Sequence, residues 1–309
     1  MATLLVSQPN FASHATPTGH PERPDRIRAV EEALSADRFD RLIRREAPSA
    51  DLTLAELVHD ANYLGILTRA RPAEGIGQID EDTFISSHSL EAAATALGGG
   101  LAALEAVALG EVRNAFCAVR PPGHHAEIDR PMGFCLINSI AVVAREAQRK
   151  FGAERVAIVD FDVHHGNGTE DIFKDDPTVF YASSHQMPLY PGTGAPSFTG
   201  VGNICNAALA AGSGGAEMRA AYSDRILPAL AAFRPDFLMV SAGFDADYRD
   251  PLAGLNWHPE DFAWVTERLV EVAERVCEGR LVSMLEGGYD RHGLATGAAA
   301  HVEMLMAAS

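Results

Sequence analysis

The feature of this sequence that most restricts its fold is a series of short, almost wholly apolar runs that alternate with longer segments of helical periodicity. The apolar runs lie at residues 4–7, 115–119, 156–161, 179–183, 237–241 and 281–285. The helical segments lie at residues 23–35, 90–109, 138–151, 216–233, 259–278 and 294–306. Strands without polar alternation are typical of a parallel sheet that helices cover on both faces. The alternation therefore predicts one α/β domain over residues 1–309.

Length, charge and cysteine content restrict the class of protein further. A chain of 309 residues with 47% hydrophobic residues can bury a core large enough to support a preorganised site. No apolar run reaches the roughly 18–20 residues of a membrane span, and the amino terminus lacks the pattern of a secretory signal. Four scattered cysteines without a C-x-x-C pair favour reduced thiols in the cytoplasm. The formal net charge of −17 argues against nucleic acid as a partner; it suits cationic substrates or simply solubility.

Polar clusters follow four of the apolar runs, at the ends where chemistry sits in α/β sheets. The first cluster is Val159-Asp160-Phe161-Asp162-Val163-His164-His165-Gly166-Asn167-Gly168. Asp160, Asp162 and His164 alternate, so their side chains share one face as the strand ends. A carboxylate and an imidazole two residues apart can bind one divalent metal if a third ligand comes from elsewhere.

The second cluster, Ser241-Ala242-Gly243-Phe244-Asp245-Ala246-Asp247, brings Asp245 to the same edge. Two aspartates and one histidine with an open coordination position match a catalytic zinc site. Oxygen and nitrogen ligands also accept iron(II) or cobalt, so these metals stay open. We interpret Asp247 and Asp250 as solvated loop acids.

Two more clusters carry groups suited to proton transfer and charge stabilisation. Arg120-Pro121-Pro122-Gly123-His124-His125-Ala126 presents adjacent histidines on a loop that its prolines restrict. Because histidine titrates near neutral pH, the pair suits acid–base work on a water molecule activated by the metal. In Leu285-Glu286-Gly287-Gly288-Tyr289-Asp290 the glycines permit close backbone approach, and Tyr289 can donate a hydrogen bond to a developing oxyanion.

With these motifs, the sequence resembles the histone deacetylase family, and in particular its class II branch and the prokaryotic histone deacetylase-like amidohydrolases. The Arg-Pro-Pro-Gly-His-His and His-Gly-Asn-Gly versions carry the class II likeness. His20-Pro21-Glu22-Arg23-Pro24 and Tyr190-Pro191-Gly192-Thr193-Gly194 also fit. The likeness runs in family order from about His20 to Tyr289. It implies an arginase-deacetylase fold with a central eight-stranded parallel sheet flanked by helices.

The resemblance also implies roles for the polar clusters. It implies one zinc ion bound by the three residues already singled out as ligands, Asp162, His164 and Asp245. His125 would act as general base and then as general acid, with His124 as its electrostatic partner. Tyr289 would be the oxyanion donor. Asp160 would orient His124 and, together with Ser183, contact a structural potassium ion.

Further residues are implied around the substrate. The walls of an acyl-lysine tunnel would comprise Gly133, Phe134 and Tyr190. Asp82 lies where the family often places an acid that grips the substrate backbone. Relatives that prefer acetylated polyamines carry an acid just after an Asp-Pro pair, whereas here Leu252 follows Asp250-Pro251. Asn167 stands where class I enzymes have Asp, which leaves His125 without a full negative charge beside it.

The sequence thus predicts a zinc-dependent amidohydrolase that removes acyl groups, with acetyl expected, from lysine side chains or related acyl amines. The substrate would be an acylated lysine peptide or protein, or a small acyl amine. An acetylpolyamine amidohydrolase is the alternative. An arginase-like dimetal hydrolase would need more carboxylates where His124, His125 and Asn167 stand, and a non-catalytic acyl-amine binding protein would not need Tyr289. The sequence leaves the oligomeric state and acyl-chain length open.

Overall fold

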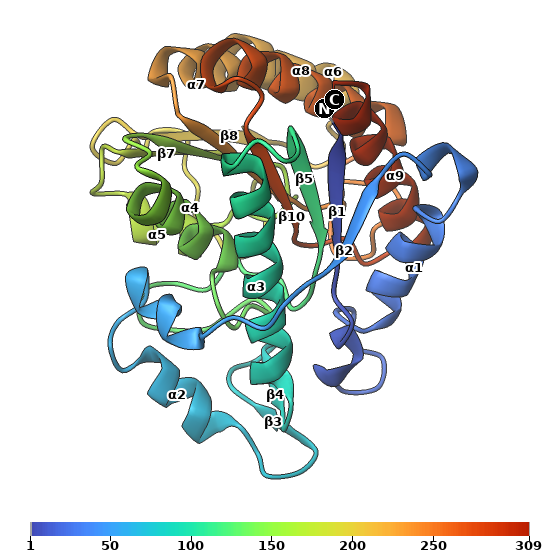
Figure 1. Cartoon of the computed structure of the whole chain (residues 1–309), viewed down its shortest axis with the longest axis vertical. Coiled ribbons are helices and arrows are strands. Elements are labelled where there is room, and N and C mark those ends of the chain that lie inside the picture. The colour runs from blue at the N-terminus through green and yellow to red at the C-terminus, as the bar shows by residue number, and fades with distance from the viewer. Residues whose placement is uncertain (1, 309) are drawn as a thin grey trace.

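The computed structural model describes residues 2–308. At its centre is an eight-stranded sheet in which all neighbouring strands run parallel (Figure 1). The strand order is β2-β1-β5-β10-β9-β6-β7-β8. The strands of this sheet are β1 (Thr3–Ser7), β2 (Ile43–Glu46), β5 (Asn114–Ala118), β6 (Val156–Asp160), β7 (Val179–Gln186), β8 (Ile204–Leu209), β9 (Phe237–Ala242) and β10 (Leu281–Leu285). A separate antiparallel ribbon pairs β3 (Ile76–Gln78) with β4 (Phe84–Ser86).

Helices cover both faces of the sheet. The α-helices are α1 (Asp25–Ala33), α2 (Tyr63–Ala70), α3 (Ser89–Ala108), α4 (Ser139–Phe151), α5 (Asn167–Phe173), α6 (Gly215–Ala221), α7 (Leu227–Phe233), α8 (Pro259–Cys277) and α9 (Arg291–Ala307). Helices α3 and α4 pack together on one face, and α1, α8 and α9 pack on the other (Figure 1). The expected central eight-stranded parallel sheet flanked by helices is therefore confirmed.

The two buried faces explain why the strands are so uniformly apolar. Successive side chains of a strand point to opposite faces. In β1, Leu5 joins the core beneath α1, α8 and α9, whereas Leu4 and Val6 join the core beneath α3 and α4. A strand in the middle of this sheet is therefore apolar at most positions, which is the pattern that the sequence shows.

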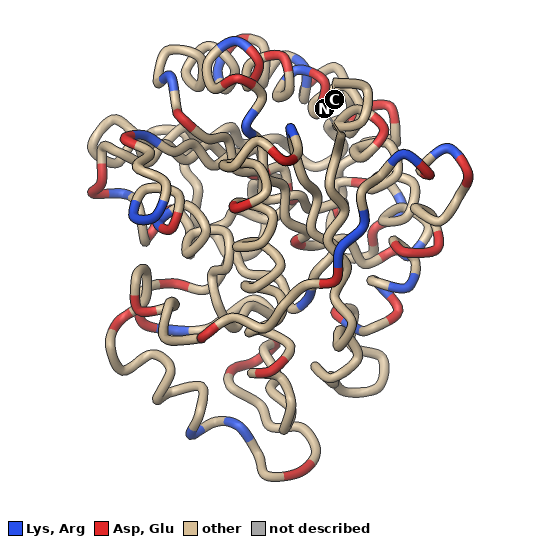
Figure 2. The backbone as a smooth tube through the Cα atoms, viewed as in Figure 1, with Lys and Arg blue, Asp and Glu red and all other residues tan. Residues whose placement is uncertain are grey.

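The sequence analysis missed the two edge strands, β2 and β8. All four residues of β2 are exposed, and Arg44, Arg45 and Glu46 give this edge its charge (Figure 2). Charged side chains on an edge strand discourage pairing with another chain. In β8 the polar Asn206 interrupts the apolar run. A search for apolar runs therefore identifies the interior strands of a parallel sheet but misses its edge strands.

The helix expected at residues 216–233 is also interrupted. Helix α6 ends at Ala221, a π-helical turn spans Tyr222–Ile226, and α7 follows. Pro228 lies just after the π turn and has no backbone N–H to donate to the preceding turn.

Helix α3 is long and apolar enough in composition to cross a membrane, but 72% of its most apolar window is buried inside the protein. It packs on β5 and β10 and against α4. A side chain on Gly98 would overlap the carbonyl group of Pro48, and one on Gly100 would crowd Met284. Its apolar character is therefore that of a core helix in close contact with its neighbours.

His301, in α9, gives the fold a measurable acid sensitivity. Its ring is buried between Thr266 Oγ1, 2.7 Å from Nδ1, and Ser283 Oγ, 2.8 Å from Nε2. Burial lowers the pKa of His301 from 6.5 to about 3, so between these values the unfolded chain binds the proton more strongly than the folded chain does. The free energy of unfolding should therefore fall as the pH drops below 6.5, by up to about 1.4 kcal/mol per pH unit from this residue.

Urea unfolding of the wild type and of His301→Gln, measured between about pH 7 and pH 5, checks this expectation. The variant should show the shallower dependence on pH. Equal slopes for the two proteins would mean that His301 does not titrate as its burial implies.

Candidate active site

The four polar clusters meet because their strands are neighbours in the sheet. They follow β5, β10, β9 and β6, which lie side by side in that order. Since the strands are parallel, their carboxyl ends share one edge. Residues from four distant parts of the chain are brought together there.

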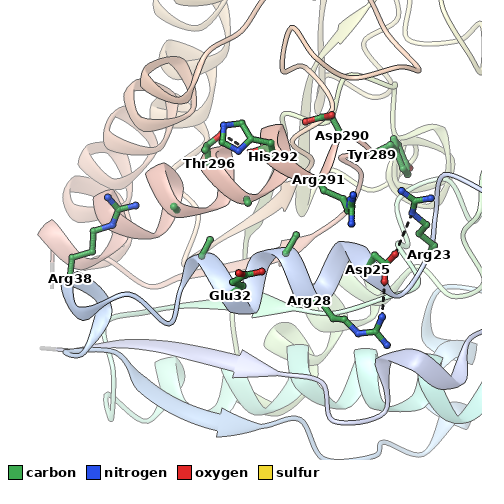
Figure 3. A pocket seen from close by; sticks show the side chains of 14 residues that line it. Arg23, Asp25, Arg28, Glu32, Arg38, Tyr289, Asp290, Arg291, His292 and Thr296 are labelled. Atoms are coloured by element: carbon green, nitrogen blue, oxygen red, sulfur yellow. Dashed lines mark hydrogen bonds and ion pairs between the residues drawn. The ribbon is translucent and has the colours of Figure 1, made fainter.

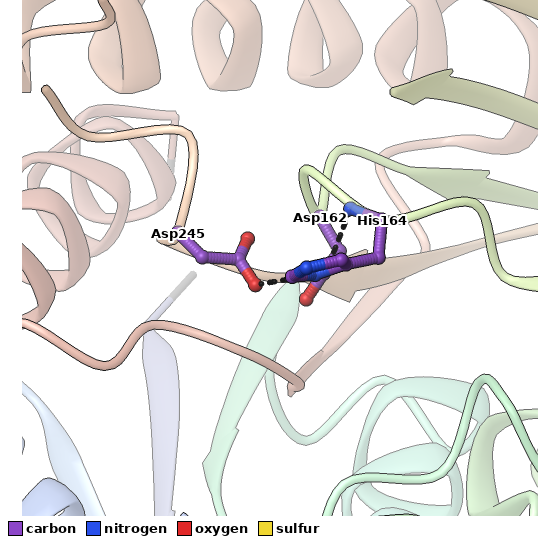
Figure 4. Close-up of side chains that lie close together, drawn as sticks. All are labelled: Asp162, His164 and Asp245. Atoms are coloured by element: carbon purple, nitrogen blue, oxygen red, sulfur yellow. Dashed lines mark hydrogen bonds and ion pairs between the residues drawn. The ribbon is translucent and has the colours of Figure 1, made fainter. Parts of the chain in front are cut away.

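Asp162, His164 and Asp245 form a compact, buried group (Figure 4). One ligand atom from each lies within 4.8 Å of the others. His164 Nδ1 lies 3.1 Å from Asp162 Oδ1 and 3.2 Å from Asp245 Oδ2. The N–H of Gly287 donates to Asp162 Oδ2 at 2.8 Å, which fixes that carboxylate. Two carboxylates and one imidazole nitrogen that converge in this way form a donor set for a divalent cation.

Close backbone approach makes this group possible. A side chain on Gly243 would collide with the Asp162 carboxylate, and one on Gly287 would collide with the carboxylates of both Asp162 and Asp245. Neither position could carry another residue without moving a ligand. Steric hindrance therefore explains why the second and fourth clusters have glycine at these positions.

The electrostatics of the group reflect two acids forced together in a dry environment. Burial, followed by the charge of Asp162, raises the pKa of Asp245 to about 7. Burial opposes the charged form of His164, but hydrogen bonds and charge from Asp162 and Asp245 prevail and raise its pKa to about 10. Such a pair of carboxylates strongly favours positive charge between them.

His124 is held by the carboxylate of Asp160. Its Nδ1 lies 2.9 Å from Asp160 Oδ2, which also accepts the hydroxyl of Tyr181 at 2.9 Å. Although burial opposes it, the negative charges of Asp160 and Asp162 raise the pKa of His124 well above its ordinary value. These carboxylates therefore favour the protonated, cationic form of His124 beside the ligand group.

His125 has the opposite character. Its Nδ1 lies 2.7 Å from Asn167 Oδ1, and burial, together with the nearby charges of His124 and His164, lowers its pKa well below 6.5. The ring is therefore neutral at pH 7 and able to accept a proton. The two histidines differ because His124 is paired with a carboxylate and His125 with an amide.

Tyr289 lies on a turn that is fixed from two sides. Its N–H donates to Asp250 Oδ2 at 2.7 Å, and Gly288 before it has a φ of +118°. The Arg26 guanidinium lies 4.9 Å from the centre of the tyrosine ring, and Arg26 Nε donates to the Gly288 carbonyl at 2.7 Å. Burial and neighbouring carboxylates raise the pKa of Tyr289 well above 10. The phenol stays protonated and can act as a hydrogen-bond donor.

Arg26 is itself held by a buried ion network. Glu22 Oε1 accepts from Arg26 Nη1 at 3.2 Å, and Arg120 Nη2 donates to Glu22 Oε2 at 2.6 Å. All three side chains are at most 1% exposed. Burial alone would raise the pKa of Glu22, but Arg120 and the other partners hold it well below 4.5.

A cavity of about 220 Å³ opens onto these groups. Its lining includes His125, His164 and Tyr289. All five residues expected to contact substrate also line it, namely Asp82, Gly133, Phe134, Tyr190 and Leu252.

The cavity wall depends on unusual backbone at two positions. Gly133 and Phe134 have φ values of +57° and +67°, and a side chain on Gly133 would collide with the His125 ring. The N–H of Phe134 donates to Thr83 Oγ1 at 3.2 Å, and that hydroxyl donates to Asp82 Oδ1 at 2.9 Å. Asp82 is thus tied to the wall of the cavity.

Ser183, the other residue expected at a potassium site, lies beside Asp160. The two residues are partners in the register of β6 and β7, and both are buried. Ser183 Oγ lies 2.9 Å from His185 Nδ1.

A larger hollow of about 880 Å³ lies elsewhere, between α1 and α9 (Figure 3). Its charges are largely paired within the protein: Arg28 lies 2.6 Å from Asp25, and Arg38 lies 2.9 Å from Glu303. It shares Tyr289 with the smaller cavity but none of the metal-ligand group. The chemistry therefore belongs to the smaller cavity.

The interpretation of Asp247 and Asp250 as solvated loop acids is wrong. They are 2% and 6% exposed, respectively. Asp247 accepts the N–H of Arg249 at 3.0 Å and pairs with its guanidinium. Asp250 accepts the N–H groups of Tyr289 and Leu252, which ties the two sides of the cavity together. Backbone N–H groups hold these carboxylates inside the protein, and the sequence alone does not reveal these hydrogen bonds.

Sequence reasoning also gave no role to Glu286 or Glu127. Glu286 Oε2 accepts the N–H of Gly123 at 2.7 Å and that of His124 at 3.2 Å, which holds the histidine loop against β10. Glu127 Oε1 accepts from Asn167 Nδ2 at 2.6 Å. Glu286 lies within a recognised motif and Glu127 directly follows one, so these positions were the available signal.

Comparisons with known proteins agree with this geometry. The sequence profile of the histone deacetylase domain matches residues 20–305. Histone deacetylase 10, chloroplastic, from Oryza sativa subsp. japonica is 39% identical over 301 residues, covering 91% of this chain and 68% of that protein. The histone deacetylase-like amidohydrolase of Pseudomonas aeruginosa is 38% identical over 281 residues, covering 88% and 73%. The crystal structure of the HDA15 HD domain matches with a TM-score of 0.93 at 33% identity, covering 99% of this chain and 89% of that one, which confirms the arginase-deacetylase fold.

Proposed function

The chain belongs to the histone deacetylase family, and from this premise we propose that it is a zinc-dependent amidohydrolase that removes acetyl groups from lysine side chains. One observation carries the proposal. His164, His125 and Tyr289 line one cavity, where an amide could meet all three. Asp162 and Asp245 lie beside His164, and His124 lies beside His125.

The donor set fits zinc. Two carboxylates and one imidazole, all buried and mutually within 4.8 Å, match a catalytic zinc site with three protein ligands, Asp162, His164 and Asp245. Zinc bound there would supply a Lewis acid that polarises the amide carbonyl and makes water a nucleophile near neutral pH.

His125 would move the proton. Because Asn167 occupies Nδ1, Nε2 is the ring atom left to take a proton from the attacking water and to deliver it to the departing amine. An amine leaves as a neutral molecule only if it is protonated. The lowered pKa of His125 keeps it ready to accept the proton, and the cationic His124 beside it favours negative charge on the substrate oxygen.

Tyr289 would donate a hydrogen bond to the carbonyl oxygen as negative charge develops there. Tyr289→Phe is therefore expected to lower kcat by about 10²–10³-fold, the usual cost of losing one oxyanion donor, with a smaller effect on KM. Steady-state kinetics on an acetyl-lysine peptide measure this loss. Because the phenyl ring keeps its contact with Arg26, unchanged thermal stability is the control. A decrease in kcat of less than about threefold would contradict the oxyanion role.

The cavity supports acyl-lysine as the substrate class. Leu252 on its wall is apolar and offers no charge to a polyamine, whereas the walls of Phe134 and Tyr190 suit an alkyl stem. A panel of acyl-lysine peptides and acylated polyamines tests this proposal. The peptide should be cleaved with the higher kcat/KM, and Leu252→Glu should move the preference toward acetylspermidine. Faster wild-type cleavage of acetylspermidine would favour the acetylpolyamine alternative.

A structural potassium ion near Asp160 and Ser183 belongs to the same proposal. The support is a buried carboxylate beside a buried hydroxyl at the end of adjacent strands. Thermal unfolding in potassium against tetramethylammonium chloride at equal ionic strength tests it, with a higher Tm expected in potassium. Equal Tm values would remove the ion from the proposal.

A single catalytic ion is favoured over an arginase-like pair. Within residues 2–308, one cluster of His, Cys, Asp and Glu side chains has the geometry to hold a metal. His124, His125 and Asn167 lie where further carboxylates would be needed. Metal counting at saturation should therefore give one catalytic zinc ion per chain, and two would favour the dimetal alternative.

A further inference from the structure

The amide of Asn167 lies between two groups that make different demands on it. Asn167 Oδ1 lies 2.7 Å from His125 Nδ1, and Asn167 Nδ2 donates to Glu127 Oε1 at 2.6 Å. Asn167 is 5% exposed, so water does not compete freely for either contact. The three side chains form a continuous line from the cavity to the protein surface.

An amide alone cannot choose the tautomer of a histidine. The amide can present its oxygen, which accepts a hydrogen bond, or after rotation its NH₂ group, which donates one. A neutral imidazole can form a hydrogen bond with either group, as a donor to the oxygen or as an acceptor from the NH₂ group. An ionised carboxylate only accepts. Glu127 therefore selects the NH₂ group of Asn167, which turns the oxygen toward His125.

That orientation has a chemical consequence. Facing an acceptor, His125 Nδ1 must carry the proton, so the lone pair of the neutral ring is on Nε2. Only with this tautomer can Nε2 take a proton from water. The reversed amide would leave the lone pair on Nδ1, on the wrong side of the ring.

Glu127 is held in place for this task. His59 Nδ1 donates to the Glu127 carbonyl at 2.8 Å, because His59 Nε2 accepts the N–H of Asn138 at 3.1 Å. Arg130 Nε donates to Glu127 Oε2 at 2.7 Å. One carboxylate oxygen is thus taken by Arg130, and the other is left for Asn167.

We infer that Glu127 is a positioning residue that fixes the tautomer of His125 by orienting the amide of Asn167. This inference rests on the proposed function, in which His125 transfers the proton. Glu127 touches no reacting atom and acts only through Asn167.

The first test is the isosteric variant Glu127→Gln, assayed as the zinc-loaded full chain. In this variant Arg130 Nε keeps the glutamine oxygen, so the glutamine NH₂ group faces Asn167. Asn167 then turns its own NH₂ group toward His125, and most of the His125 population is inactive. We expect kcat to fall at least about tenfold with little change in KM, since a wrongly oriented catalytic histidine can cost up to about 10⁴-fold. The matched control is Glu105→Gln, which makes the same substitution at an exposed ion pair with Lys150 outside the cavity, and should keep kcat within about twofold.

The second test restores the pattern with the functions of the two side chains exchanged. In Glu127→Gln combined with Asn167→Asp, the new carboxylate accepts from His125 Nδ1 and the new amide donates to that carboxylate. The kcat of the double variant should be at least about tenfold higher than that of Glu127→Gln alone. A role of Glu127 limited to loop stability predicts no such recovery.

The decisive readout does not depend on turnover. ¹⁵N NMR of labelled histidines, with His125 assigned by comparison with His125→Ala, reports which ring nitrogen is protonated. The wild type should show the Nδ1–H form, and Glu127→Gln should show mostly the Nε2–H form. If Glu127→Gln keeps both the wild-type tautomer and the wild-type kcat, the inference is overturned. If the wild type cleaves no acyl amide but Glu127→Gln alters the tautomer, the proposed function fails while the positioning role stands.

Discussion

Asp162→Ala is expected to abolish both zinc binding and amide hydrolysis. Asp162 supplies one oxygen to the ligand group and is also hydrogen-bonded by Gly287, so its loss leaves two ligands and a loosened turn beneath Tyr289. A metal that stabilises developing charge contributes several kcal/mol, and each 1.36 kcal/mol is a factor of ten in rate. Turnover should therefore fall by at least about 10³-fold.

Metal analysis of the purified variant and a turnover assay check this result together. Asp162→Asn is the companion variant, because its amide oxygen can still accept the N–H of Gly287 and so preserves the local fold. It should retain the wild-type Tm measured without metal but bind zinc weakly. A fully zinc-loaded Asp162→Ala protein with wild-type turnover would disprove the ligand assignment.

His125→Ala is expected to lower kcat by about 10²–10⁴-fold, the usual contribution of a general acid and base, while zinc content stays at the wild-type value. The reason is spatial. His125 lines the cavity beside His164 but is hydrogen-bonded to Asn167, outside the ligand group. Kinetics and metal analysis on the same preparation therefore separate this variant from Asp162→Ala.

One outcome for His125→Ala would contradict its role in proton transfer. If kcat fell only in proportion to lost zinc, His125 would be a metal-site residue and another group would transfer the proton. Added imidazole that restores part of the activity would support the acid–base role directly.

Local sequence sufficed to identify the polar residues that come together at the site, because these residues follow the ends of strands. Asp162 and His164 lie two residues apart at the end of β6, and Asp245 follows β9. The order β5-β10-β9-β6, however, is set by how helices pack across the sheet, and no local pattern contains it. Recognition of the family supplied what the residues alone could not, including the eight strands and the tunnel residues.

The positions that sequence reasoning missed share a physical cause. Asp250 looks like any other acid in a loop, and the backbone N–H of Tyr289, 39 residues away, helps to hold its carboxylate inward. The positive φ of Phe134 is equally unpredictable, since a phenylalanine seldom adopts it. Long-range hydrogen bonds, rather than residue type, determine these conformations.

The grip of Arg26 on the turn before Tyr289 also sets when the enzyme can become active during synthesis. Arg26 and Gly288 are 262 residues apart, so the oxyanion donor is secured only once the emerging chain has passed β10. A ribosome-bound fragment that ends earlier would lack Tyr289 and also β10, which lies between β5 and β9 in the sheet, so its site would be incomplete.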